Sequence, residues 1–140
     1  MNELLYSGIY PVVANDYAAA GEVSANIKQV LKKIGLSSDL IRRVSIVAYE
    51  AELNMVIHSN GGDITLAISP EQVLLHCKDT GPGIKDIGLA MTEGYSTAPE
   101  SVRMMGFGAG MGLPNMKKNA DEFCISSDQQ GTTLDIKFCI

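Results

Sequence analysis

The strongest constraint on the fold is a change of hydrophobic period near the middle of the chain. Over residues 17–34 apolar residues recur every three or four positions, which predicts a helix that ends at Gly35. A second helix, capped by Ser37 or Ser38, is expected to reach about residue 58. Apolar and polar residues then alternate over 64–78, which predicts a β-hairpin.

The remaining elements place these helices against a sheet. They are a short edge strand that ends at 12–13, a helix at 85–93, a glycine-rich stretch at 94–114, a helix at 115–120, and strands at 123–126 and 132–138. This order predicts an α/β two-layer sandwich, with helices on one face of a mixed, mostly antiparallel sheet. No linker or repeat divides the 140 residues, so we expect a single domain, 1–140.

Charge and hydropathy exclude several classes of protein. The formal charge is 11 − 16 = −5 without a compensating block of Lys and Arg, which argues against nucleic acid as the main partner. No apolar run approaches the roughly 18 residues that cross a bilayer, and the N-terminus lacks a signal-peptide pattern. We therefore expect a cytoplasmic protein that does not act at a membrane.

The cysteines do not form a recognisable metal-binding or disulfide framework. Cys77, Cys124 and Cys139 are far apart in the sequence and include no C-x-x-C pair. Each lies in an apolar, strand-like run, so we expect buried, reduced thiols within the sheet.

The second predicted helix carries an acid and an amide on its inward stripe. Glu50 and Asn54 are one turn apart and share the stripe of Val47 and Ala51, whereas Glu52 points the other way and is interpreted as solvated surface. Burial of unpaired polar groups is costly, so two polar side chains on an inward stripe are expected to have a binding partner. An Mg²⁺ ion would be one, because the amide oxygen can bind it while the carboxylate activates a hydroxyl or water. The alternative is a helix rim with a satisfied hydrogen bond.

A turn with two glycines follows the predicted hairpin. Asp79, at the end of an apolar strand, can accept a hydrogen bond from an exocyclic amine such as that of adenine. Gly81 and Gly83 let the backbone turn sharply and approach a flat ligand. The alternative is an ordinary strand-to-helix turn, which uses the same residue types.

A second glycine-rich segment alternates glycine with other residues. Gly106, Gly108, Gly110 and Gly112 free backbone N–H groups for phosphate oxygens, and the helix that follows offers its positive end. No Gly-Lys-Ser/Thr follows and no strand leads into the segment, so it is neither a Walker loop nor a dinucleotide-binding turn. In isolation, a flexible glycine loop is an equal alternative.

Taken together and in order, these motifs resemble those of the GHKL ATPase superfamily, which includes gyrase, Hsp90, histidine kinases and MutL. The motifs are Glu50-x-x-x-Asn54, Asp79-x-Gly81-x-Gly83, the glycine run at 106–112 and Gly131-Thr132-Thr133. They span nearly the whole chain. Within the superfamily the sequence is most similar to the small anti-sigma-factor and stressosome-switch serine/threonine kinases. The resemblance implies a Bergerat fold, with a lid at about 94–114.

The resemblance also implies a role for each matching position, with ATP and Mg²⁺ as cofactors. Glu50 would be the catalytic base, Asn54 the Mg²⁺ ligand and Asp79 the adenine-binding carboxylate. The other positions would shape the pocket floor, bind phosphates or support the adenine contact. They are Gly81, Gly83, Gly106, Gly108, Gly110, Gly112, and Thr132 or Thr133.

The function implied is an ATP-dependent protein serine/threonine kinase that phosphorylates and binds a STAS-type antagonist protein. A sigma factor or another effector would be the second partner, and a homodimer is left open. One alternative is a nucleotide-gated protein-binding switch with little or no phosphoryl transfer. Another is the catalytic fragment of a histidine kinase, although nothing in the sequence resembles a helix pair with a phosphoacceptor His.

Overall fold

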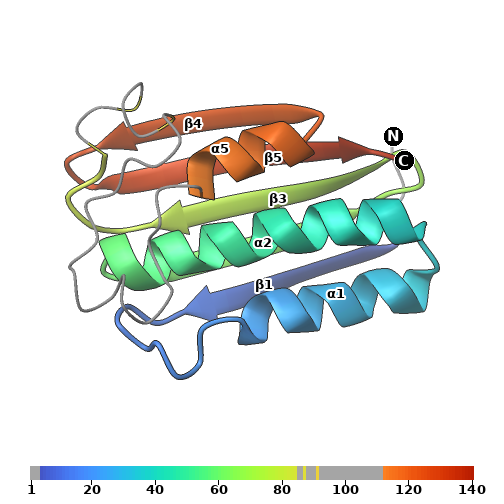
Figure 1. Ribbon diagram of the computed structural model, residues 1–140, viewed down its shortest axis with the longest axis horizontal. Coiled ribbons are helices and arrows are strands. Elements are labelled where there is room, and N and C mark those ends of the chain that lie inside the picture. Colours follow the sequence, from blue (N-terminus) through green and yellow to red (C-terminus); the bar gives the residue numbers. More distant parts are fainter. Residues whose placement is uncertain (1–3, 85–86, 88–90, 92–111) are drawn as a thin grey trace.

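In the described part of the chain, three helices cover one face of a five-stranded sheet (Figure 1). This computed structural model describes residues 4–84, 87, 91 and 112–140. The helices form one layer and the strands the other, which confirms the predicted α/β two-layer sandwich. None of the described helices combines the length and apolarity needed to cross a bilayer.

The elements lie close to their predicted positions in the sequence. The strands are β1 (Tyr6–Val12), β2 (Gly62–Ile68), β3 (Gln72–Asp79), β4 (Glu122–Asp128) and β5 (Gly131–Cys139). The helices are α1 (Glu22–Ile34), α2 (Ser38–His58) and α5 (Gly112–Asn119). Across the sheet the order is β1-β2-β3-β5-β4, and every neighbouring pair is antiparallel. Pro11 is tolerated because β1 is an edge strand.

Local signals account for the ends of the helices. Gly35 ends α1 with a left-handed φ of 87°, and its N–H bonds to the carbonyl oxygens of Leu31 and Lys32. Ser37 caps α2, where its side chain accepts a hydrogen bond from the Leu40 N–H at 3.2 Å. Both helices therefore end or begin where the turn chemistry of the sequence indicates.

The interpretation of Glu52 as solvated surface is wrong. Only 2% of Glu52 is exposed, and its carboxylate accepts backbone N–H groups from Gly21 at 2.9 Å, Val23 at 3.3 Å and Ser24 at 3.0 Å. These donors belong to the start of α1, where backbone N–H groups have no partner within the helix. Glu52 thus caps a helix 28 or more residues away in sequence, and α1 begins at Glu22 rather than near residue 17.

The core lies between the sheet and the helix layer. It consists of apolar side chains from both layers, each of which stabilises the fold by about 1.5–3 kcal/mol when fully buried. The largest fully buried side chains are Phe138, Ile27, Leu31, Ile64, Leu66, Ile68, Leu75, Met116, Ile136, Val44, Val47 and Val73.

The cysteines are free, and only one is buried as predicted. Cys77 faces the helices, and burial raises the pKa of its thiol to about 12, so it stays protonated at neutral pH. Cys124 and Cys139 are exposed, since strand alternation directs them to the face without helices.

Candidate functional site

The acid and the amide of α2 lie against the first residue of α5. A Cβ built on Gly112 would be 3.2 Å from Oε2 of Glu50 and 3.3 Å from Oδ1 of Asn54. The Asn115 side chain, one turn further along α5, forms a hydrogen bond with the Glu50 carboxylate. Three sequence-predicted residues, Glu50, Asn54 and Gly112, are therefore in one place, and the backbone can approach this closely because Gly112 has no side chain.

The surroundings of Glu50 raise the pKa of its carboxylate. Glu50 is half-buried, and burial raises its pKa above the usual value of 4.5, an effect that the Asn115 hydrogen bond partly offsets. A carboxylate with a raised pKa is a stronger base than one in water. The amide oxygen of Asn54 and a carboxylate are also oxygen donors of the kind that Mg²⁺ takes, so the two residues fit such an ion.

Asp79 is held at the end of β3 by the neighbouring strand. Its Oδ1 accepts the backbone N–H of Thr132 at 2.9 Å. Burial raises the pKa of Asp79, and the Thr132 hydrogen bond partly offsets this rise. Among the described residues, the Thr132 N–H is the single donor to this carboxylate, so Oδ2 can accept a hydrogen bond from a ligand.

Of the two candidate threonines, Thr132 is the one beside Asp79. Thr132 is buried on the helix side of β5, and its hydroxyl lies 2.8 Å from the hydroxyl of Ser127. Thr133 pairs with Lys78 and Ser126, both exposed, and therefore lies on the opposite face of the sheet. The structure brings Thr132 to Asp79 and does not bring Thr133 there.

The turn after Asp79 packs against the β4–β5 hairpin. The Gly81 N–H donates to the carbonyl oxygen of Gln130 at 3.1 Å, and the Ile84 N–H donates to the hydroxyl of Ser127 at 2.7 Å. Gly83 has a left-handed φ of 76°, and a Cβ there would overlap the carbonyl oxygen of Asp128. Packing alone thus accounts for glycine at position 83, whether or not a ligand also approaches it.

The two groups of residues lie at one end of the sandwich. In Figure 1, the end of α2, the start of α5, the end of β3 and the start of β5 all lie on the left. The predicted helix at 85–93 falls largely outside the described residues. The same holds for most of the predicted lid at 94–114, including Gly106, Gly108 and Gly110.

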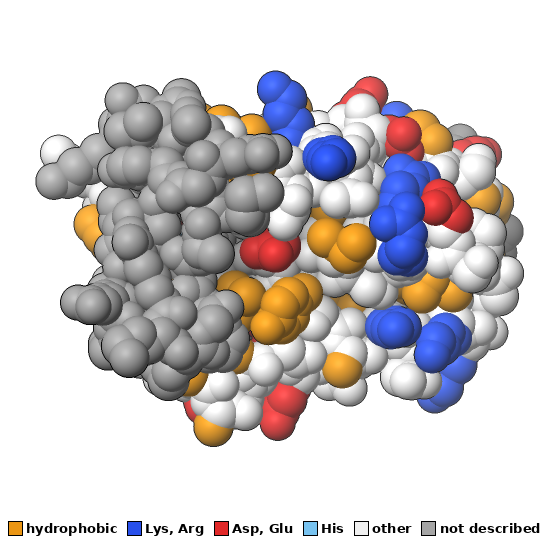
Figure 2. All heavy atoms as spheres, viewed as in Figure 1, with side chains coloured by type: hydrophobic (Ala, Val, Ile, Leu, Met, Phe, Trp, Pro, Cys, Tyr) orange, Lys and Arg blue, Asp and Glu red, His pale blue; other side chains and the backbone are white. Residues whose placement is uncertain are grey.

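Positive side chains of the described helices concentrate elsewhere on this layer. Figure 2 shows most of the Lys and Arg side chains of this face in the half away from the grey atoms. The Lys and Arg residues of the three described helices are Lys28, Lys32, Lys33, Arg42, Arg43, Lys117 and Lys118. Within the described residues, the groups of α5 next to Glu50 and Asn54 include Gly112 and the Asn115 side chain, and neither is basic.

Sequence reasoning missed the residues that support the site. Asn115 bonds to Glu50, and Ser127 joins Thr132 to the turn after Asp79. The spacing of Gly112 and Asn115, one turn apart in the same short helix, was a usable signal for the first contact. The Ser127 contacts depend on the pairing of β4 with β5 and have no local signature.

Comparisons with known proteins found similar sequences and a similar structure. A family model described as a histidine kinase-like ATPase domain matches residues 13–138. The serine/threonine-protein kinase RsbT of Bacillus subtilis (strain 168) is 28% identical over 116 residues, which cover 80% of this chain and 79% of that protein. The anti-sigma F factor of Geobacillus stearothermophilus is 32% identical over 108 residues, which cover 72% of this chain and 70% of that protein.

A solved structure has the same fold at low sequence identity. A chain of the SiaB–SiaC complex from Pseudomonas aeruginosa superposes with a TM-score of 0.56 and 12% identity. The match covers 99% of this chain and 90% of that chain. At this identity the likeness concerns the fold alone.

Proposed function

The chain belongs to the histidine kinase-like ATPase family, and from this premise we propose that it is an ATP-dependent protein serine/threonine kinase. Its substrate and binding partner would be a small regulatory protein of the STAS type. The observation that carries the proposal is the contact of Gly112 with Glu50 and Asn54, because it sets the positive end of a helix against an acid–amide pair. The names of the relatives, a serine/threonine kinase and anti-sigma factors, support the reaction and the partner class.

In this proposal Asp79 binds the adenine ring. Its Oδ1 is occupied by the Thr132 N–H, which leaves Oδ2 to accept a hydrogen bond from the exocyclic amine. Gly81 and Gly83 form the floor below the base, and the hydrogen bonds of Gly81 and Ile84 to the β4–β5 hairpin hold that floor in place.

The chemistry would take place between α2 and α5. Glu50 accepts the hydroxyl proton of the substrate serine while the serine oxygen bonds to the γ-phosphorus. The bond from that phosphorus to the β–γ bridging oxygen breaks, and ADP leaves. The backbone N–H groups at the start of α5 stabilise the phosphate charge. Asn54 would hold the Mg²⁺ ion, which when bound neutralises part of that charge.

Some parts of the proposal concern the whole chain. We propose one domain, 1–140, in which residues 94–114 form a lid over the phosphates. A sigma factor or another effector is proposed as the second partner. The protein would act in the cytoplasm, and it could do so as a homodimer.

The first experiment is a thermal melt with Mg-ATP or Mg-ADP, with and without EDTA. Ligand at about 100 times its Kd adds roughly 2.7 kcal/mol, which raises Tm by several degrees. We expect a shift that EDTA abolishes. No shift at millimolar nucleotide would contradict ATP binding.

Two variants then test the proposed roles. Glu50→Ala should keep nucleotide binding and abolish phosphoryl transfer to an antagonist protein, whereas Asn54→Ala should lose Mg²⁺-dependent binding. Transfer is measured with labelled ATP. Label retained in the Glu50→Ala reaction would exclude this residue as the base.

The second candidate function is a nucleotide-gated binding switch, which the anti-sigma factors among the relatives favour. The labelling experiment separates the candidates. Acid-stable phosphoserine on the partner supports the kinase, and tight binding without label supports the switch. Acid-labile phosphohistidine would indicate a histidine kinase fragment instead.

A further inference from the structure

Helix α5 contacts α2 at both of its ends. At its start, Gly112 lies against Glu50 and Asn54. At its end, Nη1 of Arg43 donates a hydrogen bond to the carbonyl oxygen of Asn119 at 3.1 Å. The contacts between the helices thus include a close approach at the start of α5 and a hydrogen bond at its end.

The two contacts can form together in only one register of α5 against α2. Arg43 and Glu50 are seven residues apart on α2 (50 − 43), as are Gly112 and Asn119 on α5 (119 − 112). Seven residues of α-helix span about 10.5 Å. Because Gly112 meets Glu50 and Asn119 meets Arg43, the helices run in opposite directions with matching spans. A shift of α5 along α2 by one turn, about 5.4 Å, would break both contacts.

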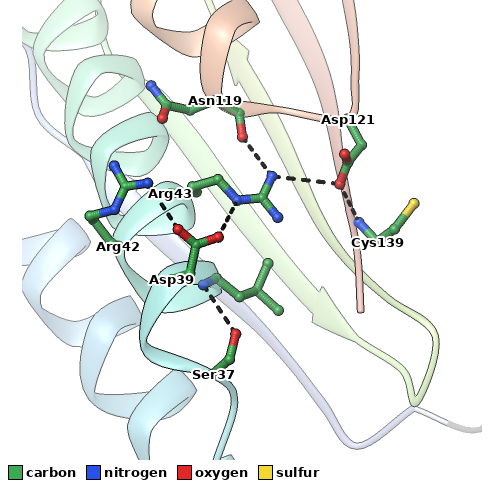
Figure 3. A network of polar contacts seen from close by, with 8 residues as sticks. Ser37, Asp39, Arg42, Arg43, Asn119, Asp121 and Cys139 are labelled. Carbon is green, nitrogen blue, oxygen red and sulfur yellow. Dashed lines mark hydrogen bonds and ion pairs between the residues drawn. The ribbon is translucent and has the colours of Figure 1, made fainter.

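The guanidinium of Arg43 contacts residues of α2, of α5 and of the segment between α5 and β4 (Figure 3). Its Nε donates to Oδ2 of Asp39 at 3.3 Å, and its Nη1 is also 3.7 Å from Oδ2 of Asp121. Asp121 in turn accepts the backbone N–H of Cys139, at the end of β5, at 2.7 Å. The side chain of Arg43 is only 23% exposed, so these contacts are partly shielded from water.

A helix as short as α5 depends on such contacts for its position. With eight residues, α5 is below the length at which an isolated helix is stable, so its position depends on tertiary contacts. Its buried side chains, Leu113 and Met116, supply apolar packing, which has little directional preference. The hydrogen bond to Asn119 has direction, and it satisfies a carbonyl that the helix leaves without a partner.

We propose that Arg43 is a positioning residue, which sets the register of α5 against α2 and so holds the start of α5 at Glu50 and Asn54. The inference rests on the proposed function, since the start of α5 is where the phosphates of ATP would bind. Arg43 acts from two turns away and touches neither nucleotide nor substrate. It therefore governs affinity for the phosphate end of the ligand and leaves the adenine end, at Asp79, unaffected.

The test compares Arg43→Ala with Arg42→Ala in the full chain. Arg42 is the matched control because it loses the same charge from the same turn, is exposed, and pairs only with Asp39, at 3.0 Å, among the described residues. NMR titrations measure the affinities for Mg-ATP and for adenosine. We expect Arg43→Ala to weaken Mg-ATP binding at least tenfold and to leave adenosine binding unchanged, whereas Arg42→Ala changes neither.

Two further measurements keep the test decisive. In nucleotide-free protein, the backbone amide resonances of Gly112 and Asn115 should move in Arg43→Ala and stay in place in Arg42→Ala. If Arg43→Ala fails to fold, Arg43→Lys, which keeps the charge but not the planar fork, is compared with Arg42→Lys by the same measurements. The expected contrast is the same, with a smaller loss of Mg-ATP affinity.

The outcomes separate the two proposals. Equal behaviour of the Arg43 and Arg42 variants, or a parallel loss of ATP and adenosine affinity in the Arg43 variant, would overturn the positioning role and leave the proposed function standing. A wild-type protein that binds neither ligand would overturn the proposed function, and the positioning role with it.

Discussion

Replacing Glu52 removes the cap of a distant helix. In Glu52→Ala, three backbone N–H groups at the start of α1 lose the carboxylate to which they donate. Because Glu52 is only 2% exposed, water cannot replace these hydrogen bonds without opening the contact between α1 and α2. The cost of unpaired buried donors therefore falls on the folded state.

The magnitude follows from the three bonds. A hydrogen bond contributes about 1 kcal/mol net, and more when one partner is charged, so we expect Glu52→Ala to lower the free energy of unfolding by at least about 3 kcal/mol. For a domain of this size, about 1 kcal/mol changes Tm by roughly 3–4 °C, so Tm should fall by about 10 °C.

Urea denaturation, followed by circular dichroism, measures the loss. The matched control is Glu22→Ala, which removes the same charge from the first turn of α1, where the side chain is exposed. The control should lose no more than about 1 kcal/mol, the contribution of a charge at a helix terminus. A loss below about 1 kcal/mol in Glu52→Ala, or equal losses in both variants, would refute the capping role.

Three further predictions concern the candidate site. Burial raises the pKa of Glu50, so its ionisation lowers the stability of the fold as the pH rises through the raised pKa. Glu50→Gln should therefore raise Tm at about pH 7 and not at about pH 4. Equal changes in Tm at both pH values would contradict this. Gly83→Ala should cost about 2–3 kcal/mol in urea denaturation, clearly more than Gly35→Ala, where a Cβ meets nothing within 4 Å. Asp79→Asn should keep the Thr132 hydrogen bond and raise Tm at about pH 7, because burial also raises the pKa of Asp79, yet it should weaken binding of a fluorescent ATP analogue.

Periodicity predicted the elements well because it reports the buried face of each one. Leu31 and Val47 face the core as their stripes predict, and the chemistry of Gly35 and Ser37 marks the helix ends. An apolar stripe on one face of a helix does not indicate whether another element packs against the polar face. Glu52 was misinterpreted for this reason, since the start of α1 covers the side of α2 that the stripe leaves polar.

The residues of the candidate site were predictable where they are local. Glu50 and Asn54 are one turn apart on a helix, so their proximity follows from helix geometry. The choice of Thr132 over Thr133 depends on the register between β3 and β5, and a shift of one residue would reverse it. Arg43 lies 76 residues from Asn119, and no sequence pattern links them.

The two ends of the described chain are held by the same hairpin turn. The Leu5 N–H donates to the carbonyl oxygen of Ile68 at 2.7 Å, and the Ile140 N–H donates to that of Glu71 at 2.9 Å. Since β1 and β5 are three strand spacings apart, the gap is about 14 Å, which a linker of about six residues spans easily. A circular permutant joined there and opened at the turn around Gly35 would alter only the end of the sandwich remote from Asp79 and Glu50.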